Sequence, residues 1–227
     1  MILFTICSLA YLLTLLSIRP APLSLKAEVP SFGQHAMSIR VSLLLGLLLL
    51  GIFMVTSNFG FIEADPAIID GYAMRGGWVL EPRSPPFGLT HWLLHIDFQH
   101  LLTNVAGLGL LSIYERRVGA RRFVAVLLVA CLASAFSVFF YPASIRLCGI
   151  SGGLFGLAAA YFVDERSMTT KDWLLAIVYF GVIVGLLTLD GNLRSSSARA
   201  VDFQIDHLGH FLGALGAVVY CRLRPLS

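Results

Sequence analysis

Charged residues are scarce in this 227-residue sequence. They make up 13% of the chain, whereas hydrophobic residues make up 57%, and a soluble domain typically has about 25% charged residues. The mean hydropathy is +0.83, and no polar stretch is long enough to form a separate aqueous domain. These values argue against an ordinary soluble enzyme and predict a single integral membrane domain.

Cysteine is scarce as well. Cys7, Cys131, Cys148 and Cys221 occur singly, in or beside different apolar stretches, without the spacing of a metal site or a disulfide framework. The sequence contains no internal repeat, no glycine-rich nucleotide motif and no low-complexity tail. We therefore expect no metal, no cofactor and no nucleic-acid partner, and we interpret the cysteines as small apolar side chains.

Long apolar stretches account for most of the sequence. They cover residues 2–18, 41–59, about 89–114, 123–141, 149–163, 173–189 and about 203–221. Most approach the roughly 20 residues that an α-helix needs to cross a bilayer. We predict an all-α, multi-pass membrane protein with a six-helix domain at 41–227. Residues 1–40 supply an extra apolar helix and a cytoplasmic linker; a cleaved signal peptide is the alternative for residues 1–18.

The basic residues indicate how the chain is oriented. If the connection before residue 41 is cytoplasmic, alternating spans place eleven of the 16 lysines and arginines inside and five outside, as the positive-inside rule requires. Two loops, 60–88 and 190–202, then lie on the outer side, and substrate access beside 173–189 is our hypothesis. A bacterial plasma membrane suits this topology, with an organelle membrane as the alternative.

A serine lies in the most glycine-rich apolar stretch, "CGISGGLFGLAAAYF", where Ser151 is the only hydroxyl before Tyr161. A helix over 149–163 covers only about 22 Å, less than the roughly 30 Å hydrocarbon core. It is therefore predicted to begin below the outer surface, at the base of a hydrated pocket. A hydroxyl in lipid is costly unless it is used; the alternative is a serine tolerated within a glycine packing face.

The last apolar stretch, "DHLGHFLGALG", carries two histidines. Serine is a weak nucleophile until a base takes its proton, and ionisable groups inside a membrane usually face the protein interior. His210 lies among small residues that would let its helix approach the serine helix, so we predict His210 rather than His207 as the base. Two histidines that merely bond within a polar seam are the alternative.

A pair of possible hydrogen-bond donors occurs in "THWLLHIDFQHLLTNVAGL". His100 and Asn104 are four residues apart and share one helical face. Acyl transfer builds negative charge on a carbonyl oxygen, and preorganised donors stabilise that charge. We predict that His100 and Asn104 form such an oxyanion site, while His91 and His95 bond groups of the loop.

Several motifs together resemble the rhomboid family of intramembrane serine proteases. "GISG" is similar to the family's Gly-x-Ser-Gly nucleophile motif, and "HLLTN" to its His-x-x-x-Asn oxyanion motif. "YERRVG" at 114–119 resembles the stretch between the second and third core helices, and "DHLGHFLGALG" the last-helix pattern. The resemblance spans about residues 41–221, with the motifs in the family's order.

The resemblance implies a six-helix core and peptide-bond hydrolysis in or near a substrate's transmembrane segment. Ser151 and His210 would form a dyad without a third acid, so Asp206 is interpreted as an interfacial residue. His100, Asn104 and the Ser151 N–H would bind the oxyanion, and Phe155 falls where the family stacks an aromatic on the catalytic imidazole. The implied partners are single-span or other transmembrane substrates and the lipid bilayer.

Two other functions fit parts of the sequence. A non-catalytic membrane protein of the same fold would bind transmembrane helices without cleaving them. A small transporter would use the buried polar groups as a path, although the inverted repeats typical of transporters are missing. Both remain alternatives to the protease.

Overall fold

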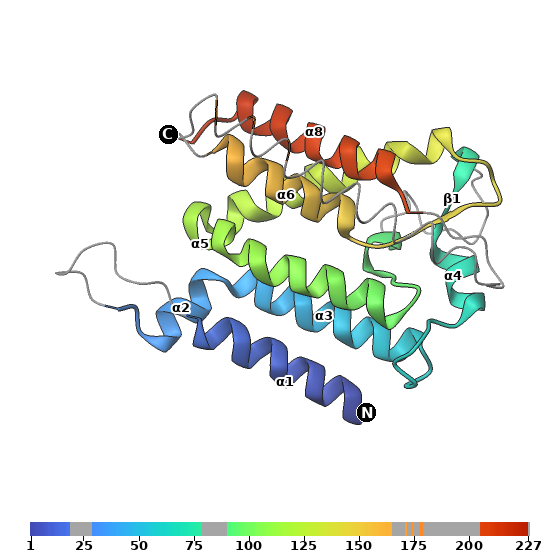
Figure 1. Ribbon diagram of the computed structural model, residues 1–227, viewed down its shortest axis with the longest axis horizontal. Coiled ribbons are helices and arrows are strands. Elements are labelled where there is room, and N and C mark those ends of the chain that lie inside the picture. The colour runs from blue at the N-terminus through green and yellow to red at the C-terminus, as the bar shows by residue number, and fades with distance from the viewer. Residues whose placement is uncertain are drawn as a thin grey trace.

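The described part of the chain consists mainly of α-helices. The computed structural model describes residues 1–18, 29–78, 90–164, 171, 174, 178 and 205–226. The helices are α1 (Ile2–Ser17), α2 (Phe32–Ser38), α3 (Arg40–Thr56), α4 (Pro66–Tyr72), α5 (Phe98–Ala135), α6 (Ser151–Val163) and α8 (His207–Leu223). The described part also contains the short 3-10 helices η1 (Gly76–Trp78), η3 (His91–Leu93) and η4 (Phe136–Phe140). Two short strands are β1 (Met74–Arg75) and β2 (Arg146–Leu147). Figure 1 shows α6 and α8 side by side, α1 beside α3 at the opposite edge, and α5 between these pairs.

The prediction of a mostly helical chain is confirmed. The apolar stretches 2–18, 41–59 and 203–221 correspond to α1, α3 and α8. The helix predicted to begin near residue 89 begins instead at Phe98, because the Asp97 side chain caps it by accepting a hydrogen bond from His100 N at 2.7 Å. The predicted helix 173–189 and the loop 190–202 lie outside the described residues, apart from residues 174 and 178. The six-helix core therefore stays a prediction.

The long helix α5 is divided at Gly119. This residue has φ 80° and ψ 161°, which is not a helical conformation, and Figure 1 shows that the chain reverses direction within α5. Glycine suits the position because other residues adopt positive φ only at a cost in free energy. The two segments, 98–118 and 120–135, correspond to two separate apolar stretches of the sequence.

The helices present much of their apolar surface to the outside. Among the described residues, one helical stretch, Phe98–Phe140, is long and apolar enough to cross a membrane, and only 39% of its most apolar window is buried. The bent pair Phe32–Ser38 and Arg40–Thr56 passes the same test as one span, while α1 and α6 are shorter apolar helices. Large side chains such as Leu44, Leu110 and Phe140 are exposed, as expected for a surface that lipid covers.

The first helix packs against α3 and α5 through a tyrosine. The Tyr11 hydroxyl donates to Ser42 O at 2.7 Å, and the tyrosine ring occupies the space that a side chain at Gly46 would need. A methyl group at Gly109 would lie 3.5 Å from the same ring. Two glycines on neighbouring helices thus create the recess that the ring of Tyr11 fills.

A buried carboxylate caps the start of α3. Glu115, on α5 and 0% exposed, accepts hydrogen bonds from Val41 N, Ser42 N and Ser42 Oγ, each at 2.8 Å. The first N–H groups of a helix have no partner within the helix, and a negative charge there is favoured by the helix dipole. Glu115 therefore fixes α3 against α5.

A second buried carboxylate anchors the end of α6. Asp164 accepts hydrogen bonds from Tyr114 Oη at 2.7 Å and from Arg122 Nε and Nη2 at 2.8 and 2.7 Å. Arg117 Nη2 donates to Asp164 O at 2.6 Å. Because the Arg122–carboxylate contact uses two parallel N–H groups, it restrains orientation as well as distance. The network joins α6 to both segments of α5.

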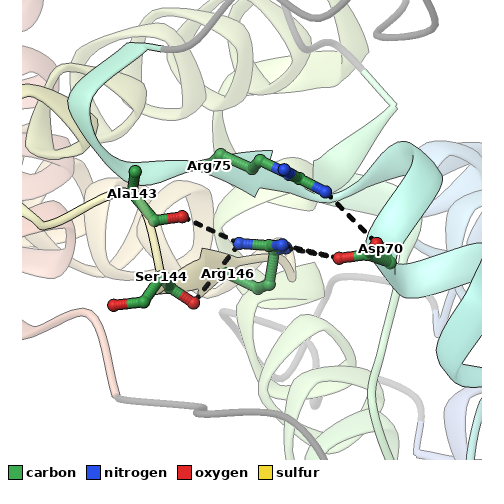
Figure 2. A network of polar contacts seen from close by, with 5 residues as sticks. All are labelled: Asp70, Arg75, Ala143, Ser144 and Arg146. Atoms are coloured by element: carbon green, nitrogen blue, oxygen red, sulfur yellow. Dashed lines mark hydrogen bonds and ion pairs between the residues drawn. The ribbon is translucent and has the colours of Figure 1, made fainter.

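An ion-pair cluster joins α4 to the chain before α6 (Figure 2). Strands β1 and β2 pair in antiparallel register, Met74 with Leu147 and Arg75 with Arg146. Asp70 of α4 contacts both arginines, at 3.2 Å and 2.6 Å. Hydrogen bonds from Arg146 hold the pKa of the Asp70 carboxyl below its ordinary value, so the ion pairs persist to a lower pH than an unpaired aspartate would stay charged.

We expect Glu115→Gln to destabilise the fold. Glutamine offers one acceptor oxygen in place of two, which leaves a buried N–H of α3 without a partner at a cost of about 1–3 kcal/mol. Thermal unfolding of the detergent-solubilised protein measures the loss, and Glu63→Gln, at an exposed acid, is the control. Equal unfolding midpoints for the two variants would contradict the capping role.

Candidate active site

The chain turns sharply just before Ser151. Gly149 has φ +106°, a conformation that favours glycine, and its N–H donates to His91 O at 2.8 Å. The predicted helix 149–163 therefore begins two residues later, with Ile150 as the N-cap and Ser151 as the first helical residue. Since the first N–H groups of a helix have no intrahelical partner, the Ser151 N–H has no partner within α6 itself.

The structure brings Ser151 and His210 together. Ser151 Oγ lies 2.7 Å from His210 Nε2, and both residues are half-buried. His207 lies one turn earlier on α8, with its ring centroid 6.2 Å from that of His210. Of the two histidines that the sequence offered, His210 is thus the one that contacts the serine hydroxyl.

Glycines permit this contact by allowing α6 and α8 to approach closely. A methyl group at Gly156 would lie 2.9 Å from Gly213 O and 3.3 Å from Ala217 Cβ. A methyl group at Gly213 would lie 2.9 Å from Gly152 C and 3.2 Å from Ala130 O. Real side chains do not tolerate such distances, so larger residues here would force the helices apart.

An aromatic ring orients the imidazole. Phe155, one turn after Ser151 on α6, stacks on His210 with ring centroids 4.3 Å apart and an interplanar angle of 7°. Parallel stacking restricts rotation of the imidazole about its own bonds. Two residues of α6 therefore contact the His210 ring: Ser151 at its edge, through Nε2, and Phe155 on its face.

The predicted donor pair lies beside the turn that precedes Ser151. A methyl group at Gly149 would lie 2.7 Å from His100 Nε2 and 3.5 Å from Asn104 Nδ2. Asn104 is only 4% exposed, and its Nδ2 has no hydrogen-bond partner within the described part of the chain. A buried amide donor without an acceptor is costly, and an oxygen atom of a ligand would satisfy it.

Asp206 caps α8 and bonds to η4. Its carboxylate accepts from Gly209 N at 2.7 Å and from Ser137 Oγ at 2.5 Å. These contacts fix the start of α8 one turn before His210. The interpretation of Asp206 as an interfacial residue stays a prediction.

The other polar groups of the described residues form no second cluster of this kind. All four cysteines are free, and among the described residues no group of three or more His, Cys, Asp or Glu side chains could hold a metal ion. The backbone oxygen of His91 accepts a hydrogen bond from Gly149 N, and His95 Nδ1 lies 3.3 Å from Leu93 O. The ring of His95 also lies against that of His100, at 4.9 Å between centroids.

The comparison with known families covers this entire set of residues. A family model described as the Rhomboid domain matches residues 88–224, which include Ser151, His210, His100 and Asn104. The chain belongs to the rhomboid family. Rhomboid proteins are membrane-embedded and are usually intramembrane serine proteases, although some members are inactive. No curated protein matches the chain significantly.

Sequence reasoning missed the short elements near the Ser151 end of α6. The sequence predicts a loop at 60–88, but the described part of this stretch contains α4 and β1. The signal for α4 was present, since Asp65 followed by Pro66 matches an N-cap and first-turn pair. No local sequence pattern predicts β1 and β2, because a strand of two residues is defined only by the strand with which it pairs.

We expect Gly213→Ala to separate α6 from α8 and to lower stability by about 1–3 kcal/mol, the usual cost of overpacking. Gly51→Ala, where nothing lies within 4 Å, is the control and should be neutral or slightly stabilising. Thermal unfolding of both variants measures the difference. A neutral Gly213→Ala would show that the two helices are not in close contact.

Proposed function

We propose that this rhomboid protein is a serine endopeptidase that hydrolyses peptide bonds in or near the transmembrane segments of other membrane proteins. The observation that carries the proposal is the 2.7 Å contact between Ser151 Oγ and His210 Nε2. A nucleophile and a base within hydrogen-bond distance, with the base held by a third group, form the usual arrangement for covalent catalysis. Here the third group is the stacked ring of Phe155.

The reaction begins at the serine hydroxyl. His210 Nε2 takes the proton of Ser151 as Oγ attacks the carbonyl carbon of the scissile bond, so the neutral imidazole carries its own proton on Nδ1. His210 then gives the proton to the departing amine, which leaves an acyl group on Ser151. Water, deprotonated by the same imidazole, attacks the ester and releases the new carboxyl end together with the free serine.

The tetrahedral intermediates carry a negative oxygen that needs donors. Asn104 Nδ2, the His100 ring and the Ser151 N–H supply them in this proposal. The position of His100 and Asn104 beside Gly149 supports the assignment, as does the buried, unsatisfied amide of Asn104. Such preorganised donors are often the largest single contribution to catalysis.

The helix lengths support a site below the outer membrane surface. The 13 residues of α6 rise about 20 Å, less than the roughly 30 Å hydrocarbon core. The end of α6 opposite Ser151 is bound to Arg117 and Arg122, and basic residues favour the cytoplasmic side. Ser151 then lies about 10 Å beneath the outer surface, in a pocket that opens outward.

The rest of the proposal rests on the sequence. We place the protease in a bacterial plasma membrane, with residues 41–227 as the catalytic membrane domain and residues 1–40 as a preceding helix and cytoplasmic linker. Its substrates are single-span or other transmembrane proteins that reach the pocket within the bilayer.

The decisive test removes the nucleophile and the base. Ser151→Ala and His210→Ala should each lower cleavage of a single-span model substrate by about 10⁴-fold or more, and Ser151→Ala should abolish labelling by a fluorophosphonate. Ser112→Ala, at another buried serine, is the control. Substrate capture without cleavage by the unaltered protein would instead favour the non-catalytic, helix-binding alternative.

The donor assignment has its own test. Asn104→Ala should lower kcat by about 10²–10³-fold while KM changes little, because the amide acts on the transition state. Thr103→Ala, at an exposed neighbour on the same helix, is the matched control. A kcat equal to that of the control would remove Asn104 from the oxyanion site.

A further inference from the structure

A buried arginine organises the segment that leads into Ser151. Arg146, five residues before the serine, is 9% exposed. Its guanidinium donates to Ala143 O at 2.9 Å and to Ser144 O at 3.3 Å, so it shapes its own loop. The other two guanidinium nitrogens of Arg146, Nε and Nη2, donate to Asp70 Oδ1 at 2.9 and 2.6 Å (Figure 2). One side chain thus joins the loop 143–146 to α4.

Asp70 holds together two arginines that would otherwise repel. Arg75 and Arg146 lie directly opposite each other in the β1–β2 ladder, and like charges in that position are destabilising. Figure 2 shows both side chains directed at the Asp70 carboxylate. The Asp70 side chain is 53% exposed, against 11% for Arg146. The free-energy cost of removing a charge from water therefore falls mainly on Arg146.

The anchored segment continues directly into the proposed site. Ile145 O accepts from Gly76 N at 3.1 Å, and Gly149 N donates to His91 O at 2.8 Å. Strand β2 lies between these two hydrogen bonds. The turn at Gly149 and then the first residue of α6 follow β2 directly. A shift of β2 therefore moves Gly149 relative to His100 and Asn104, which lie beside it.

We propose that Arg146, anchored by Asp70, is a positioning residue that sets the distance between the Ser151 turn and the oxyanion donors. The proposal rests on the proposed protease function. Neither residue touches the reacting atoms. The pair acts by holding β2 against β1 and α4. Misplacement of about 1 Å can lower a rate by about 10²-fold, so a small displacement of β2 has a measurable effect.

The test compares two substitutions of the half-exposed aspartate. Asp70→Asn keeps the shape of the side chain and removes its charge, whereas Asp70→Glu keeps the charge and changes the length. If the charge pair positions the site, Asp70→Asn lowers kcat by about tenfold or more with KM nearly unchanged, and Asp70→Glu keeps most of the activity. Arg75→Ala leaves the Arg146–Asp70 pair in place and should match the unaltered protein.

The measurements separate positioning from stability. The rate constant of fluorophosphonate labelling at Ser151 should fall in Asp70→Asn in parallel with kcat, while the final labelled fraction stays the same because the protein is folded. Arg146→Lys, which keeps the charge but not the fork, should show a loss of the same kind. Thermal unfolding midpoints are recorded for every variant.

Three results would overturn the proposal. Asp70→Asn could react at the unaltered rate, Asp70→Glu could be as slow as Asp70→Asn, or the variants could differ only in unfolding midpoint. In each case Ser151 of the unaltered protein still reacts with the fluorophosphonate, so the protease function stands. If the unaltered protein is neither labelled nor active, the protease function fails, and the positioning role falls with it.

Discussion

The close approach of α6 and α8 is the constraint on which the rest of the site depends. A serine hydroxyl and an imidazole on two helices can touch only if the backbones lie nearer than ordinary side chains allow. Gly156 and Gly213 provide that approach, since a methyl group at either would collide with the backbone of the other helix. Within a membrane this packing must itself stabilise the pair of helices, because lipid tails offer no hydrophobic advantage to association.

Once the two helices are close, the remaining contacts determine where along them the reactive groups lie. Asp164 holds the far end of α6 through Tyr114 and Arg122, and the turn at Gly149 holds the near end. On α8, Asp206 caps the start of the helix and bonds to Ser137. A short helix fixed at both ends cannot slide along its partner, so the registration of Ser151 with His210 is maintained.

Buried polar groups in this protein fall into two kinds. Glu115 and Asp164 have several hydrogen-bond partners each, and they join helices far apart in sequence. Asn104 Nδ2 is buried without a partner in the described part of the chain. Satisfied groups of the first kind specify the fold, whereas an unsatisfied donor beside the turn at Gly149 is what the proposed oxyanion site requires before the substrate arrives.

The sequence by itself determined the class of the protein, most of its helices and the residues of the candidate site. Apolar run length and the small residues around Ser151 and His210 are local properties, and they are readable because a membrane allows few backbone conformations. The small residues around His210 already favoured it over His207, and the structure shows its contact with Ser151. Only the tertiary structure decided that Arg146 meets Asp70 across 76 positions. Side-chain contacts between distant segments depend on helix rotation and depth, which packing of the whole bundle sets and no local pattern encodes.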